Sequence, residues 1–126
     1  MNVAELARSA YSTTRTSIRT DRSAEHDVFS RITSDLSKAA ALGKPGFSSL
    51  VAALHENRKL WRVLALDVSD KNNELPKELR AQIFYLAEFT DTHTRKVLAG
   101  TASSEALIEI NKSVMRGLRG VSGFTQ

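Results

Sequence analysis

Cysteine is absent from this sequence, proline occurs only twice, and no apolar run approaches the length of a membrane span. Without cysteine the chain can form no disulfide bond, thiolate zinc site or cysteine nucleophile. A bilayer span needs about 20 consecutive apolar residues, so we expect no membrane contact. The first residues lack the basic-then-apolar layout of a secretory signal peptide. These absences predict a cytoplasmic protein, and its 126 residues suit one domain.

Positive charge is concentrated near the beginning of the chain. Lys and Arg exceed Asp and Glu by 18 to 14, giving a net charge of +4. Residues 6–20 contain no acid and many Ser and Thr, which are weak helix formers. We therefore predict a basic, weakly ordered arm over residues 1–20. The arm is either a solvated tail or a binding site for nucleic acid or an acidic partner. We favour the solvated tail, because so few arginines could contact only a few phosphates. In the second case the binding residues are Arg8, Arg15, Arg19 and Arg22.

Four stretches have apolar residues every three or four positions, the spacing of amphipathic helices, and none alternates as a strand does. They cover about residues 22–42, 48–68, 76–99 and 104–118. Glycine and proline at positions 43–46 predict the end of the first helix, and Pro76 predicts the start of the third. Short connections place neighbouring helices antiparallel. The sequence thus predicts an all-α fold, a small antiparallel helical bundle of about four main helices over residues 21–120, with a tail over 121–126.

The sequence motifs that would indicate a catalytic or metal-binding site are incomplete. His55-Glu56 begins like a zinc-protease motif, but Lys59 occupies the position of the second histidine ligand. Residues 70–74 begin like a calcium-binding loop, but the central glycine and the final glutamate are missing. We therefore expect no enzymatic activity, no metal site and no cofactor.

An asparagine interrupts each of two apolar helix faces. Asn57 lies one turn before Trp61, and Asn111 lies among the apolar residues of the last helix. A buried amide without partners costs about 1–3 kcal/mol, so each must find a hydrogen bond. The simpler interpretation is that each amide bonds a backbone group near a helix end. The second interpretation is that the two amides share a polar contact, which fixes the helix register or binds the backbone of a partner.

Aromatic residues lie on several faces of the predicted helix over residues 76–99. Phe84 falls on its polar side, and Tyr85 and Phe89 flank its apolar stripe. Such a helix either occupies the centre of the bundle or presents a face to another protein. Trp61, the only tryptophan, either fills the core or anchors an interface. The candidate partner-binding residues are Asn57, Trp61, Phe84, Tyr85, Phe89 and Asn111.

Short motifs follow one another in a fixed order along the chain. They are L-x-x-N-x-x-x-W-x-x-L-x-x-D over residues 54–67, N-x-L-P-x-x-L-R-A-x-I over 73–83, His-Thr at 93–94, and L-I-x-I-N-x-x-x-M-x-G-L over 107–118. Together with Tyr11 and residues 20–25, this series resembles the flagellar biosynthesis regulator family FlaF of alphaproteobacteria. Asp21 stands where many members have proline.

The resemblance implies a role in making the flagellar filament. It implies a regulator that promotes flagellin synthesis or secretion for filament assembly and motility, opposite a second regulator, FlbT, which restrains flagellin expression after transcription. It also implies that flagellin is bound in the manner of an export chaperone, with FlbT as a further candidate partner.

Two alternatives remain open at the level of sequence. The chain could bind flagellin mRNA directly through its basic arm, although it has no RNP, KH or OB signature. It could also be a structural subunit of the flagellum, although its ends lack the low complexity of such secreted subunits.

Overall fold

Long α-helices make up nearly all of the chain that the structure describes. The computed structural model describes residues 15–124, and side chains over residues 26–117. Four α-helices and one short 3-10 helix occupy this range, and no strand occurs within it. These elements are α2 (Arg15–Ala41), η1 (Lys44–Gly46), α3 (Phe47–Ser69), α4 (Lys77–Leu98) and α5 (Glu105–Phe124). The all-α prediction is confirmed.

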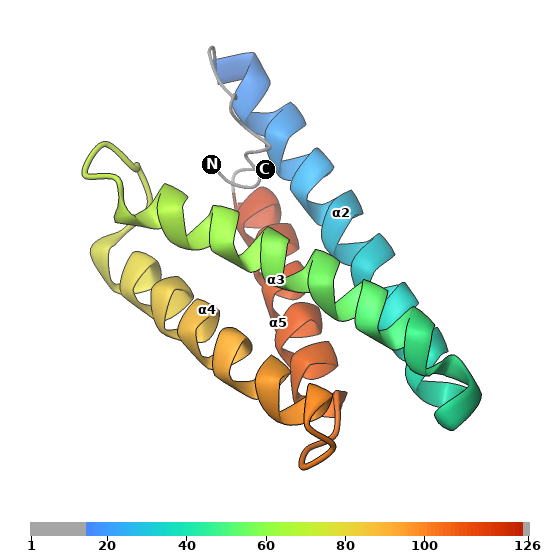
Figure 1. Cartoon of the computed structure of the whole chain (residues 1–126). Helices are drawn as coiled ribbons and strands as arrows, with labels where there is room; N and C mark the ends of the chain where they lie inside the picture. Colours follow the sequence, from blue (N-terminus) through green and yellow to red (C-terminus); the bar gives the residue numbers. More distant parts are fainter. Residues whose placement is uncertain (1–14, 125–126) are drawn as a thin grey trace.

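The four helices form an antiparallel bundle in which consecutive helices run in opposite directions (Figure 1). Helix α3 packs against α2 and α4, and α5 also packs against α2 and α4. Helices α3 and α5 therefore occupy opposite corners of the bundle, and side chains must extend across the core for them to meet. Short connections between amphipathic helices favour this up-down arrangement.

Two glycines form the turn between α2 and α3, as the sequence predicts. Gly43 has a backbone φ of 67°, a value that residues with a side chain rarely adopt. Gly46 is buried, and a Cβ atom there would lie 2.6 Å from the carbonyl oxygen of Ala39. The chain can therefore reverse tightly here only because position 46 has no side chain.

The loop before α4 is held by asparagine and aspartate side chains. Asp70 Oδ1 accepts a 2.9 Å hydrogen bond from the backbone of Asn72. The side chain of Asn73 accepts a 3.0 Å bond from the backbone of Leu75 and donates a 3.1 Å bond to the carbonyl of Asp67. Such bonds are typical of Asx turns. The residues that resemble the start of a calcium loop therefore have a turn-forming role.

Helix α4 ends in a Schellman motif around Gly100. The backbone N–H of Thr101 donates to the carbonyl of Lys96 at 2.9 Å, and that of Gly100 donates to Val97 at 3.0 Å. Gly100 has a φ of 80°, which suits the left-handed residue that this motif requires. The predicted stop at Gly100 is thus confirmed by its hydrogen bonds.

The first and last helices extend beyond the periodic stretches that the sequence shows. Helix α2 begins at Arg15 and includes residues 15–20, which were predicted to belong to the arm. Ser and Thr cost only a few tenths of a kcal/mol each in a helix, which does not prevent this extension. Helix α5 continues through the predicted tail to Phe124 despite a cost of about 1 kcal/mol per glycine. The rest of the predicted arm, residues 1–14, lies outside the described residues.

Large apolar side chains from α2, α3 and α5 fill the core. Phe29 and Trp61 pack edge to face with ring centroids 5.8 Å apart. Both are buried, together with Leu36, Leu54 and Leu107. Among the residues that the structure describes, no helix has the length and apolarity needed to cross a membrane.

Candidate functional site

A buried hydrogen-bonded chain connects the opposite helices α3 and α5. The indole Nε1 of Trp61 donates to Asn111 Oδ1 at 2.9 Å. Asn111 Nδ2 then donates to Asn57 Oδ1 at 2.8 Å. All three side chains are buried. The two amides therefore share a polar contact, and the simpler interpretation, in which each bonds a backbone group near a helix end, is wrong.

This contact lies inside the protein and not on its surface. Asn57 and Asn111 are 0% exposed, so neither presents its amide to a partner. Their inclusion among the partner-contact residues is corrected accordingly. They lie on helix faces that meet in the core, where an amide can satisfy a second amide and an indole. Their structural role is to fix how α3 and α5 face each other.

Some buried polar groups of α3 and α4 are not satisfied. Thr94 Oγ1 donates a 2.6 Å hydrogen bond to the carbonyl of Thr90. Thr90 Oγ1 and Asn57 Nδ2 are buried and have no hydrogen-bond partner among the described residues. A buried unpaired polar atom costs about 1–3 kcal/mol. These two unpaired atoms therefore lower the stability of the fold.

The three aromatic residues predicted on α4 lie on the surface. Phe84, Tyr85 and Phe89 are 41%, 65% and 36% exposed. Phe89 stacks on His93 with ring centroids 5.3 Å apart, and His93 Nε2 lies 2.8 Å from the carbonyl oxygen of Ser103. The aromatic side chains of this helix therefore face outward, and their contact with another protein stays a prediction. Large exposed aromatics are typical of sites that contact other proteins.

A groove of about 460 Å³ runs between α3 and α4. Its apolar lining comes from Trp61, Ala65, Phe84 and Ala87, and its polar lining comes from Arg58, Arg62, Glu88, Thr90, Asp91 and Thr92. Although Trp61 is 1% exposed, its ring contributes to the wall of this groove. Trp61 thus fills the core, the first of the two interpretations given for it, and it also lines a groove at the surface.

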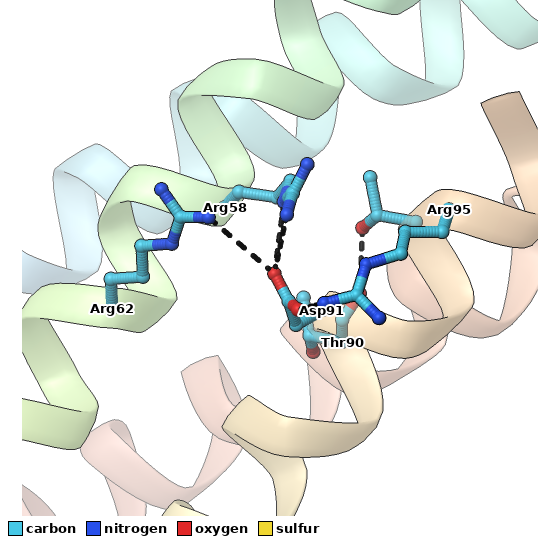
Figure 2. Close-up of polar contacts among 6 residues, drawn as sticks. Arg58, Arg62, Thr90, Asp91 and Arg95 are labelled. Atoms are coloured by element: carbon cyan, nitrogen blue, oxygen red, sulfur yellow. Dashed lines mark hydrogen bonds and ion pairs between the residues drawn. The ribbon is translucent and has the colours of Figure 1, made fainter.

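Three arginines surround a single aspartate, a set that we call the Asp91 cluster (Figure 2). Arg58, Arg62 and Asp91 line the groove, and Arg95 contacts Asp91 from beside it. Arg58 donates to Asp91 Oδ1 through Nε at 3.0 Å and through Nη2 at 2.7 Å. Arg95 Nη2 donates to Oδ2, while Arg62 Nη2 lies 3.7 Å from Oδ1, too far for a hydrogen bond. The cluster therefore has a net charge of +2, and its guanidinium groups outnumber the oxygens they surround.

These arginines change the acidity of Asp91. The hydrogen bonds from Arg58, helped by the positive charges of Arg58, Arg95 and Arg62, lower the pKa of Asp91 below its ordinary value of 3.8, although partial burial opposes the shift. Sequence reasoning missed this cluster. Arg95 follows Asp91 by four residues, a spacing visible in the sequence, but Arg58 lies 33 residues away and only the packing of α3 on α4 brings it near.

The arginines proposed for RNA binding, Arg8, Arg15, Arg19 and Arg22, lie outside the side chains that the structure describes. Arg8 lies outside the described residues. Arg15, Arg19 and Arg22 lie in α2, but their side chains are outside the described range. Among the side chains that are described, no group of three His, Cys, Asp or Glu is placed to hold a metal ion.

Comparison with known proteins places the chain in a family. The family model described as flagellar protein FlaF matches residues 7–118, a range that includes α3, α4 and the groove between them. Searches of curated proteins and of solved structures give no match. Because the family match covers most of the 126 residues, the chain belongs to the FlaF family of flagellar proteins.

Proposed function

We propose that this protein binds flagellin in the cytoplasm as a non-enzymatic adaptor or export chaperone and thereby promotes flagellin synthesis or secretion. Membership of a flagellar family supports a flagellar role. The observation that carries the finer proposal is the exposure of Phe84, Tyr85 and Phe89 on one helix. Removing such apolar surface from water is the main favourable contribution to most protein–protein association.

The mode of binding that we propose is a helix of flagellin packed against α4. Amphipathic helices bind other proteins by placing their apolar face in a groove between helices. The α3–α4 groove is a concavity of this kind, and Phe84 belongs both to its lining and to the exposed aromatic set. In this arrangement the protein covers apolar flagellin surface before export. FlbT is a second proposed partner, for which the family resemblance is the support.

Co-elution tests the proposal. Purified protein and flagellin are mixed, treated with nuclease and separated by size exclusion at low and high salt. We expect a stoichiometric complex that survives both treatments, because burial of apolar surface is weakly sensitive to salt. Flagellin that never co-elutes would refute the proposal. A complex that disappears with nuclease would instead support binding to flagellin mRNA.

A further inference from the structure

The Asp91 cluster has more hydrogen-bond donors than the protein itself uses. Asp91 Oδ1 already accepts two bonds from Arg58, and Oδ2 accepts one from Arg95. Arg62 donates no hydrogen bond to another described residue, and its side chain is 63% exposed. Arg95 is also mostly exposed and uses a single nitrogen on Asp91. Since a guanidinium group has five donors in a planar fork, both residues can bind a further oxyanion.

The groove beside these arginines has an apolar lining with small residues. Ala65 from α3 and Ala87 from α4 line it together with Trp61 and Phe84. Alanines allow a helix backbone to come close, and the exposed ring of Phe84 provides apolar contact area. The groove between the two antiparallel helices thus has room for one further helix, which would lie beside the positively charged arginines.

We propose that the α3–α4 groove binds an acidic amphipathic helix of a partner protein, and that Arg62 and Arg95 hold a carboxylate of that helix. The acidic character of the proposed helix is inferred from the positive charge beside the groove. The charged residues that line the groove, Arg58 and Arg62 against Asp91 and Glu88, balance one another. Arg95, which contacts Asp91 beside the groove, leaves a surplus of +1. An acidic side chain complements this surplus, and the apolar face of the same helix contacts the Phe84 ring and the alanines.

A nucleic acid fits the same groove less well. A phosphodiester backbone has a negative charge on every nucleotide and would place several of them near Asp91 and Glu88, whereas an amphipathic helix can place a single carboxylate beside Arg62 and Arg95. The alanine-lined part of the groove would also contact nothing apolar on such a backbone. The proposal takes from the proposed function only that the occupant is a protein segment, and its test does not need flagellin.

The test uses the full chain and a designed peptide. The probe is a synthetic amphipathic helix with leucine on one face and glutamate along its edge, and the control peptide has glutamine in place of every glutamate. Backbone amide spectra of labelled protein report where each peptide binds, and the indole signal of Trp61 is a unique reporter because the chain has one tryptophan. We expect shifts confined to the groove and an affinity about tenfold lower for the glutamine peptide, since charged hydrogen bonds are stronger than neutral ones.

Variants assign the effect to the two arginines. In Arg62→Gln/Arg95→Gln the two peptides should bind with equal affinity, whereas Arg31→Gln, an exposed arginine paired with Asp35 on α2, should leave the tenfold difference unchanged. Thermal unfolding of each variant confirms that the fold is retained. Shifts outside the groove, equal binding of both peptides to the wild-type chain, or stronger competition by a short single-stranded RNA would overturn the proposal.

The outcomes separate this inference from flagellin binding. If the glutamate peptide binds the groove but flagellin does not co-elute, the groove assignment stands and flagellin is not the partner. If flagellin co-elutes with wild type and with Arg62→Gln/Arg95→Gln equally, and the peptides give no shifts in the groove, the groove assignment is refuted while flagellin binding stands.

Discussion

Trp61 and Asn111 lie 50 positions apart in the sequence, yet the indole N–H of Trp61 donates a 2.9 Å hydrogen bond to the Asn111 side chain in the core. The side-chain amide of Asn111 in turn donates a hydrogen bond to Asn57, which lies one turn before Trp61 on α3. The next residues along the same helix, Arg58 and Arg62, line the outer groove. The inner contact thus sets the rotation of α3 about its axis, and that rotation sets which arginines face the groove.

Replacing Asn111 with alanine should destabilise the fold by about 3 kcal/mol, because it leaves the Trp61 N–H and Asn57 Oδ1 buried without partners. Urea unfolding measures the effect. Asn72→Ala is the control, since Asn72 lies in an exposed loop and engages Asp70 through its backbone N–H. It should change stability by less than about 0.5 kcal/mol. Equal effects of the two substitutions would contradict a structural role for the buried amide.

Replacing Asp91 with asparagine should remove a pH-dependent part of the stability. Because the pKa of Asp91 is lowered in the folded state, its ionised form stabilises the fold above its ordinary pKa of 3.8, and the contribution is lost as pH falls through the folded value. The carboxylate is partly exposed, so we expect a loss of about 1 kcal/mol at pH 7. Unfolding curves of wild type and Asp91→Asn should converge as the solution is acidified.

A matched control for Asp91 is Glu109→Gln, which removes an exposed carboxylate 3.8 Å from Lys112. Exposed pairs of this kind contribute from nothing to about 1 kcal/mol, and the loss should be smaller than that at Asp91. The free energies of unfolding of wild type and Asp91→Asn are compared as the pH falls. If their difference stays constant or grows, the arginines do not stabilise the ionised aspartate.

Two glycines should respond in opposite ways to alanine. At Gly46 the added Cβ would lie 2.6 Å from a backbone carbonyl and 2.7 Å from Leu42 Cβ, so Gly46→Ala should destabilise the protein by about 1–3 kcal/mol. Gly117 lies in α5 with nothing within 4 Å of such a Cβ, so Gly117→Ala should stabilise by up to about 1 kcal/mol. Melting temperatures that move in the same direction would contradict the packing described at the α2–α3 turn.

Much of the fold could be predicted from the sequence because helix periodicity and stop signals are local. Gly43, Pro76 and Gly100 mark turns through their own backbone preferences, and all three lie at or beside helix ends in the structure. The outer helix ends were less predictable. Ser, Thr and Gly lower helix propensity by small amounts, and a long helix can accommodate them, as α2 and α5 do.

The site was only partly predictable because its contacts join distant positions. The position of Phe84 on the polar side of a helix was visible in the sequence, but it left open whether the helix was central or faced outward. Only the structure shows that Phe84 is exposed. Whether Asn57 meets Asn111 depends on how α3 and α5 rotate toward each other across the core, which periodicity does not specify. The same holds for Arg58 and Asp91, which meet only once α3 packs on α4.

The most direct test of the central claim is a calorimetric titration of flagellin into wild type and into Phe84→Ala/Tyr85→Ala/Phe89→Ala. Truncation of aromatic residues at the centre of an interface should weaken binding at least about tenfold. Phe47→Ala is the control, since Phe47 is 52% exposed but belongs to the first turn of α3 and not to α4. The account predicts that only the triple variant loses affinity; equal affinity for all three chains, or no binding to wild type, would contradict it.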